Sequence, residues 1–340
     1  MSGGYDSRVL AILCSTIGLK PYCFTYSKTG DSRCFEVENA RFVAERLGFN
    51  WDEINIDNEC NWLNTCVELY GVSSHAHFGH ALEFYSNIRN KYQSSTCTVI
   101  SGYLGDIFAG KTLKQGITSS TDLYNMYSMT SGNYKLSSQL MHAPFELGHV
   151  KNYFNENQAL LKNPKTAVID LYRNKSCLLS YLTRIPEYFN MSVICPFAEP
   201  NVALSMLNLP EDRRRGRKWQ FEFIKRHGLS DPPGRKTYTM YRQKAFRSST
   251  LRPLDRDLLS KYIRIDKVDE INKYINLLKS NKKLSSFLLY YSIARDRTRN
   301  SNLKYITRFM PADKLLHIYC EYMVLLPLDN LLKRARDEDP

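Results

Sequence analysis

The sequence lacks any long apolar run. No stretch of its 340 residues reaches the roughly 18 consecutive apolar residues that a membrane-spanning helix requires. It also does not open with a charged segment followed by an apolar one, the pattern of a secretory signal. The sequence therefore predicts a cytoplasmic protein without a membrane partner.

The paired cysteines of zinc and redox motifs are missing as well. The chain has 9 cysteines, an odd number, and no two of them are spaced as Cys-x-x-Cys. Cys14, Cys97 and Cys195 each lie in an apolar stretch. This pattern is typical of buried, reduced thiols and argues against a zinc site.

Acidic residues are fewer than basic ones. The chain has 47 Lys and Arg against 34 Asp and Glu, a formal net charge of +13. Such an excess favours anionic partners: a nucleotide, pyrophosphate, a nucleic acid or a membrane face. The densest basic cluster is Arg213–Lys218, which equally fits the solvated start of a helix. Charge alone does not select one partner.

Strand-like and helix-like segments alternate in the first third of the chain. Helical periodicity covers residues 8–19, 36–47 and 81–92, and short apolar runs at 21–26, 51–56 and 96–100 predict strands. Such alternation is typical of an α/β protein with a mainly parallel sheet.

Helical spacing dominates after Gly116, and there is no internal repeat. The predicted helical segments are 136–141, 171–182, 202–209, 219–224 and 277–291. We therefore expect an α/β core in residues 1–115 and a mostly helical part in residues 116–340. The last residues, 333–340, are expected to form a frayed polar tail.

The run Ser2-Gly3-Gly4-Tyr5-Asp6-Ser7 directly precedes the first predicted helix. Glycines let backbone N–H groups approach phosphate oxygens, and the helix N-terminus adds partial positive charge. Ser2 and Ser7 can donate hydrogen bonds to the same anion. Asp6 would repel a triphosphate unless Mg²⁺ lies between them. This loop therefore predicts a binding site for ATP and Mg²⁺.

The loop resembles the signature of the N-type ATP pyrophosphatases, which include asparagine synthetase, β-lactam synthetase, GMP synthetase and the tRNA lysidine synthetases. The resemblance implies an adenine-nucleotide α-hydrolase-like, Rossmann-like core. It also implies cleavage of ATP between the α and β phosphates, transfer of AMP to the substrate, and displacement of AMP by an amine. In that superfamily the loop follows a first core strand. Here it begins at Met1, so we expect that strand to be missing through truncation or loss.

A second loop, Ser101-Gly102-Tyr103-Leu104-Gly105-Asp106, follows the predicted strand 96–100. It resembles the Ser-Gly-x-Gly-x-Asp motif of the asparagine synthetase family, with Leu104 at the family glycine and Gly105 as its substitute. The resemblance implies that Gly102 contacts ATP and that Asp106 joins Asp6 in binding Mg²⁺.

Tyr103 stands where asparagine synthetases have Glu and β-lactam synthetases have Tyr. Its hydroxyl could serve the acyl-adenylate step, or its ring could simply pack.

Further residues match the family more weakly. Thr25 and Tyr26 correspond to the strand whose backbone contacts adenine, and Cys195–Pro200 resembles the family's Pro-Phe-x-Asp segment. The family then carries a lysine that contacts the α-phosphate and pyrophosphate, where it would neutralise charge on the leaving group. Lys236 and Lys244 are both candidates for this role.

The stretch Gly105–Thr112 is also a literal Walker A match, with Lys111 as its lysine and Asp170 as a candidate Walker B acid. A Walker loop leads into an apolar helix, but residues 111–120 contain few apolar side chains. We therefore reject this alternative.

A histidine-rich segment invites a metal interpretation. His75, His77 and His80 lie close together in the sequence, but no adjacent cysteine or carboxylate completes a tetrahedral set. We expect either a polar loop that lines a substrate pocket or no functional role there, and Glu83 is the nearest carboxylate that could act as a base.

The combined pattern predicts an ATP- and Mg²⁺-dependent carbon–nitrogen ligase, as in asparagine biosynthesis, acting on a small-molecule carboxylate and ammonia or an amine. The glutaminase domain of glutamine-dependent asparagine synthetases is absent, so nitrogen would come from free ammonia, a separate glutaminase or an amine substrate. Nothing in the sequence indicates the oligomeric state.

Two alternatives stay open. The net charge would suit a tRNA-modifying relative such as a lysidine synthetase, although that group lacks the second motif, which argues against a nucleic-acid partner. A truncated or degenerate scaffold that binds nucleotide without catalysis is the other.

Overall fold

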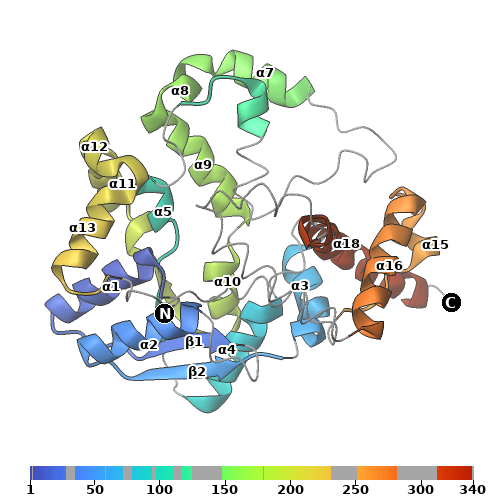
Figure 1. Ribbon diagram of the computed structural model, residues 1–340, viewed down its shortest axis with the longest axis horizontal. Coiled ribbons are helices and arrows are strands. Elements are labelled where there is room, and N and C mark those ends of the chain that lie inside the picture. Colours follow the sequence, from blue (N-terminus) through green and yellow to red (C-terminus); the bar gives the residue numbers. More distant parts are fainter. Residues whose placement is uncertain are drawn as a thin grey trace.

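The computed structural model describes residues 1, 3–27, 35–57, 59–71, 79–93, 97–110, 116–124, 148–178, 180–230, 251–281 and 312–338. In these ranges the chain is mostly helical and contains two small parallel sheets (Figure 1). The predicted mixed α/β class is correct at this level.

The first sheet is built as the sequence predicts. Strands β1 (Cys23–Ser27) and β2 (Trp51–Asn55) are parallel, with Cys23 opposite Trp51 and Ser27 opposite Asn55. The connecting helix α2 (Phe35–Leu47) packs against both strands. Such a β-α-β crossover is the standard connection between parallel strands.

Helix α1 (Tyr5–Thr16) precedes this unit and begins three residues before the predicted helix. It ends at Ile17 and Gly18, where Gly18 has φ +76°. Glycine takes this left-handed conformation without a Cβ penalty, which is why it stops helices. Gly48, with φ +66°, ends α2 in the same way.

The second sheet joins segments that are far apart in the sequence. Strand β3 (Thr98–Ile100) follows α4 (Gly79–Lys91) and pairs in parallel with β4 (Ser192–Ile194). Residues 116–340, for which the sequence predicts a mostly helical structure, therefore also supply a strand, β4. No strand in the described ranges links β1–β2 to β3–β4, so the continuous Rossmann-like sheet is not seen there.

Helices account for the rest of the described chain. They are η1 (Glu59–Trp62), α3 (Leu63–Tyr70), α5 (Gly105–Phe108), α7 (Gly148–Glu156), α8 (Gln158–Lys162), α9 (Pro164–Leu178), α10 (Tyr181–Tyr188), η3 (Pro196–Ala198), α11 (Pro200–Leu207), α12 (Glu211–Arg214), η4 (Arg215–Arg217), α13 (Lys218–Arg226), α15 (Arg256–Leu259), α16 (Ile265–Ser280) and α18 (Ala312–Glu338). The predicted helices 171–182, 202–209 and 219–224 fall on α9–α10, α11 and α13, whereas residues 136–141 and 282–291 lie outside the described ranges.

The main hydrophobic core lies under α1. Val9 and Ile12 of α1 are buried with Ile107 of α5 and Leu171 of α9. Each such side chain contributes about 1.5–3 kcal/mol when it is fully removed from water. This core fixes α1 relative to the loop that follows β3.

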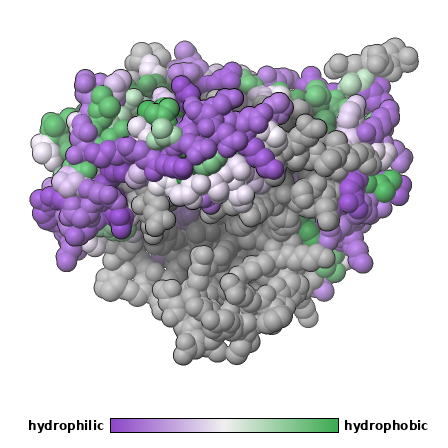
Figure 2. Space-filling model, turned by 90° about the horizontal axis from the view of Figure 1, so that it is seen from above, coloured by the Kyte–Doolittle hydropathy of each residue, from purple (hydrophilic) through white to green (hydrophobic). Residues whose placement is uncertain are grey.

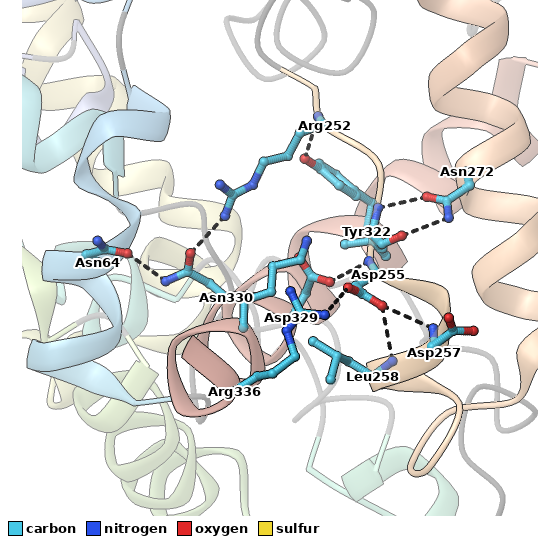
Figure 3. Close-up of polar contacts among 12 residues, drawn as sticks. Asn64, Arg252, Asp255, Asp257, Leu258, Asn272, Tyr322, Asp329, Asn330 and Arg336 are labelled. Carbon is cyan, nitrogen blue, oxygen red and sulfur yellow. Dashed lines mark hydrogen bonds and ion pairs between the residues drawn. The ribbon is translucent and has the colours of Figure 1, made fainter. Parts of the chain in front are cut away.

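A second core forms where α15, α16 and α18 pack together, with Leu63 of α3 at its edge (Figure 1). Polar contacts tie this helical unit to α3 (Figure 3). Asn330 of α18 donates to Asn64 Oδ1 at 2.8 Å and accepts from Arg252 Nη2 at 2.9 Å.

The prediction of a frayed polar tail at residues 333–340 is wrong for residues 333–338. Helix α18 continues to Glu338. Lys333 Nζ pairs with the fully buried Asp329 at 2.7 Å, one turn earlier, and Arg334 pairs with Glu68 of α3 at 3.3 Å. These contacts hold the last turns in helical form.

Polar side chains cover most of the described surface in the view of Figure 2, where hydrophobic residues appear only in small groups. Among the described helices, none combines the length and apolar character needed to span a membrane. Cys14, Cys23, Cys66, Cys97 and Cys195 are free thiols.

Candidate functional site

The first predicted loop forms the N-terminus of α1. Gly4 is the N-cap residue, and Ser7 Oγ donates to its carbonyl at 2.9 Å. Gly3 has φ +65° and packs so closely on α2 that a Cβ would lie 2.7 Å from Asn39 Cβ. Only glycine fits both the backbone conformation and the space.

Asn39 of α2 lies directly behind this turn. Only 1% of the residue is exposed, and neither its amide nitrogen nor its amide oxygen has a hydrogen-bond partner in the described structure. Burying such atoms unpaired costs about 1–3 kcal/mol each, so this arrangement requires a reason. The sequence did not single out Asn39.

Arg8 holds the turn from inside the protein. Its side chain is buried, its Nε donates to Gly3 O at 2.8 Å, and its Nη1 donates to Leu229 O at 3.1 Å. The guanidinium also lies 5.3 Å from the centre of the Tyr5 ring. A buried positive charge at the start of α1 favours an anion in front of the loop.

The two predicted loops meet, although about 100 residues separate them in the sequence. An ideal Cβ on Gly105 would lie 2.8 Å from Asp6 Cγ, and one on Gly102 would lie 3.2 Å from Asp6 Cβ. Asp106 follows Gly105 directly, in the first turn of α5. The structure therefore brings the Asp6 carboxylate against the backbone of the loop that carries Asp106.

The second loop is held in a tight conformation. Tyr103 N donates to Ser101 Oγ at 3.3 Å, and Leu104 has φ 66°. Leucine thus occupies a position whose backbone conformation is the one that glycine favours. Gly105 is instead needed for contact with Asp6, because a Cβ there would also meet Phe197 Cδ2 at 2.8 Å.

Tyr103 is 8% exposed and belongs to the main hydrophobic core. Its ring therefore packs, and a chemical role for its hydroxyl stays a prediction.

Gln220 of α13 is a site residue that the sequence reasoning missed. Its Nε2 donates to Asp6 Oδ1 at 2.9 Å, and the residue is completely buried. Its other amide atom, Oε1, has no hydrogen-bond partner in the described structure. The only available signal was its place in a predicted helix after the Pro-Phe segment, which did not indicate which face it occupies.

The predicted adenine-contacting strand is β1. Thr25 Oγ1 donates to Met1 O at 2.6 Å and accepts from Trp51 Nε1 at 3.0 Å. The Tyr26 ring lies 5.1 Å from the His80 ring. The side chain of Thr25 is thus engaged by protein groups, which leaves the backbone of β1 as the part that could contact a base.

The Pro-Phe-x-acid segment lies beside the site. Phe197 is buried against Gly105, and Glu199 caps α11 by accepting from Val202 N at 2.9 Å. The acidic residue of this segment therefore has a helix-capping role.

Several predicted residues lie outside the described ranges. These are Ser2, the lysines Lys111, Lys236 and Lys244, and the histidines His75 and His77. His80 is buried in α4 between the rings of Tyr26 and Tyr181. Glu83 is also buried and accepts from Asp57 N at 2.8 Å. Within the described ranges, no group of three or more His, Cys, Asp or Glu side chains could hold a metal.

The rejected Walker interpretation fails on structure as well. Asp170 lies inside helix α9, not at the end of a strand, and its carboxylate accepts from the Tyr153 hydroxyl.

Electrostatics near the site argue against a thiol nucleophile. Burial raises the pKa of the Cys195 thiol above its ordinary value, although an interaction with Ser101 partly opposes this shift. The thiolate form is therefore scarce at neutral pH.

The basic cluster 213–218 is partly neutralised by acidic residues on either side of it in the sequence. Arg213 pairs with Glu222 at 2.9 Å, Arg215 pairs with Glu211, and Arg217 lies 4.9 Å from the Tyr5 ring centre. A solvated helix start therefore describes most of this cluster.

A shallow apolar cavity lies between α11 and α13, away from Asp6. Its lining residues are Asn201, Val202, Ser205, Met206, Leu209 and Trp219. None of them belongs to either predicted loop.

No protein-family model matches the chain, and no curated protein matches it significantly. The functional assignment therefore rests on the residues and their geometry.

Proposed function

We propose that the protein is an ATP- and Mg²⁺-dependent amide-forming ligase of the asparagine synthetase type, in which the Rossmann-like arrangement serves nucleotide binding. The observation that carries this proposal is the contact between Asp6 and the Gly102–Gly105 backbone. Two loops with complementary sequence patterns meet at one place, as a shared nucleotide site requires.

The residues at this place fit a magnesium-bound triphosphate. Glycines at 3, 102 and 105 permit close backbone approach, and Arg8 adds buried positive charge. Asn39 and Gln220 present buried amide atoms that have no hydrogen-bond partner among the described residues. Asp6 and Asp106 would hold Mg²⁺, which prefers carboxylate oxygens. When bound, the ion neutralises charge on the leaving pyrophosphate.

In the proposed reaction, a carboxylate oxygen of the substrate attacks the α-phosphorus of ATP. The bond from that phosphorus to the bridging oxygen breaks, and pyrophosphate leaves. Ammonia or an amine then attacks the acyl carbon, AMP leaves, and the nitrogen loses a proton. The loop Gly3–Ser7 orients the phosphates, while Lys236 or Lys244 would stabilise the pyrophosphate.

The first test is carboxylate-dependent exchange of labelled pyrophosphate into ATP, screened over amino acids and other small carboxylic acids. We expect exchange with the wild-type protein and a loss of at least about 100-fold in Asp6→Asn, because a neutral amide is a poor magnesium ligand. The exposed Asp212→Asn is the matched control and should keep full exchange. Release of ADP in place of AMP would contradict the proposal.

A second candidate function is a scaffold that binds nucleotide without catalysis. It is favoured by the absence, in the described ranges, of a strand joining the two sheets. This candidate predicts that Mg-ATP raises the melting temperature while no carboxylate supports exchange. The tRNA-acting alternative gains no support, because Arg213 and Arg215 already have acidic partners.

A further inference from the structure

We propose that Gln220 is a positioning residue of the candidate magnesium site: one amide atom fixes the Asp6 carboxylate, and the other accepts a hydrogen bond from a water molecule on the bound cation. This inference rests on the proposed function and adds to it a residue of α13, from the mostly helical part of the chain. The two loop motifs do not include it.

The side chain of Gln220 contacts the Asp6 carboxylate directly. Gln220 Nε2 donates to Asp6 Oδ1 at 2.9 Å across 214 positions of sequence. An ionised carboxylate can only accept, so this bond fixes which amide atom faces Asp6. The same Oδ1 lies 2.9 Å from the place of a Cβ on Gly105. The carboxylate is therefore confined between α13 and the second loop.

The packing of α13 on α1 makes this arrangement stable. The Tyr5 and Phe221 rings meet edge to face at 4.5 Å, and Arg217 lies over the Tyr5 ring. The ring contact joins the residues next to Asp6 and Gln220 in sequence, and the second contact joins Tyr5 to the N-cap residue of α13. These contacts fix the start of α13 against the start of α1, beside the Gln220–Asp6 hydrogen bond.

The amide oxygen of Gln220 is unpaired within the described structure. Gln220 is 0% exposed, and its Oε1 has no donor in the described structure. A buried acceptor without a donor costs about 1–3 kcal/mol. A leucine at this position would avoid that cost, so the amide is expected to have a partner in the working protein.

A water molecule on a divalent cation is the donor that fits. Magnesium usually keeps several of its waters in protein sites, and coordination makes their hydrogens strong donors. Carboxylate ligands are commonly oriented by a hydrogen-bonded residue behind them, whose loss weakens metal binding 10–100-fold as a rough guide. Gln220 holds Asp6 and offers an acceptor from the same amide.

The test measures Mn²⁺ binding to the full chain by calorimetry and electron paramagnetic resonance, with melting temperatures recorded in parallel. In Gln220→Leu we expect Mn²⁺ affinity to fall by about 10–100-fold, while the melting temperature without metal stays unchanged or rises. A purely structural role would do the reverse: lower stability with unchanged affinity. Gln158→Leu, on α8, is the control and should change neither.

Gln220→Glu provides a second, independent readout. It places another carboxylate against Asp6, so we expect a lower melting temperature without metal and a larger rise with Mg²⁺ or Mn²⁺ than in the wild type. A destabilised Gln220→Glu protein that metal does not rescue would overturn the inference. This variant also decides the question if Gln220→Leu fails to fold.

The outcomes separate the two proposals. Wild-type Mn²⁺ affinity in Gln220→Leu, with pyrophosphate exchange intact in the wild type, removes the role of Gln220 and leaves the ligase. Metal binding that depends on Gln220 without any exchange removes the ligase and leaves the site. A wild-type protein that binds no metal overturns both.

Discussion

Two adjacent residues of the second loop show how a single side chain shapes the candidate site. Leu104 holds a left-handed conformation that costs a non-glycine residue about 1 kcal/mol or more, and its buried side chain offsets this by packing in the core. Gly105 has an ordinary helical backbone but no room for a Cβ. The glycine is thus required by its neighbour Asp6, not by its own conformation.

Substituting Gly105 tests this close approach. In Gly105→Ala, the new Cβ would meet both Asp6 Cγ and Phe197 Cδ2 at 2.8 Å, so one of them must move. We expect a loss of about 1–3 kcal/mol in the free energy of unfolding and a marked loss of Mg-ATP binding. Urea unfolding and calorimetry measure the two effects.

Gly148→Ala on α7 is the matched control for this substitution. An added Cβ there meets nothing within 4 Å. We expect unchanged or slightly increased stability, since alanine is the better helix former. Equal behaviour of the two variants would show that Asp6 does not depend on the space at Gly105.

Helix caps decide stability at the scale of a single element, and α15 is the clearest case (Figure 3). Asp255 is its N-cap residue, and its Oδ1 accepts from Asp257 N at 3.1 Å and Leu258 N at 3.2 Å. The bond from Leu258 is the main cause that holds the pKa of Asp255 below its ordinary value, and the bond from Asp257 adds to it.

Removal of this cap should destabilise the C-terminal helical unit. We expect Asp255→Ala to lower the free energy of unfolding by about 1–2 kcal/mol near neutral pH, measured by urea unfolding. The exposed Asp257→Asn should change it less, because it only reduces the charge near the helix start.

The pH dependence of the stability that this cap contributes follows from the direction of the Asp255 pKa shift. A carboxylate whose pKa is lower in the folded state stabilises the protein fully above its unfolded pKa. The difference between wild type and Asp255→Ala should therefore be largest at neutral pH. It should shrink as the pH falls below the ordinary value of 3.8. A difference that grows in acid would contradict this account.

At the scale of the whole molecule, the core formed by α15, α16 and α18 meets the rest of the described chain at α3. Helix α3 supplies Leu63 to this core and Cys66 to a smaller buried cluster with Leu82 and Ile185. Helix α3 packs on α18, and the Asn64–Asn330–Arg252 chain of hydrogen bonds crosses this boundary. Arg252 Nε is also buried at this boundary and has no hydrogen-bond partner in the described structure. The boundary therefore has few spare acceptors that could replace a lost hydrogen bond.

Asn330→Ala should loosen the contact between α18 and α3. It removes two hydrogen bonds and leaves Arg252 Nη2 without its acceptor, at a cost of about 1–3 kcal/mol. Hydrogen exchange should then rise in α18 and α3 together, with little change in α1. Asn152→Ala, on the exposed face of α7, should leave exchange in all three helices as in the wild type.

The sequence by itself determined the local pattern. Apolar periodicity and terminal glycines located α1, α2 and α4, and short apolar runs located β1, β2 and β3, because these signals depend on neighbours along the chain. The same local reasoning identified both glycine-containing loops. It did not locate α18 or the part of α16 before residue 277, and it predicted a frayed tail where Arg334 of α18 pairs with Glu68 of α3.

Only the tertiary structure decided which of these pieces meet. Long-range packing pairs β4 with β3, brings Gly105 against Asp6 and brings Gln220 to the same carboxylate. The physical reason is that a buried polar contact depends on how two helices are oriented relative to each other. Residue spacing determines which side chains share a face of one helix, but it does not determine which faces of two helices meet.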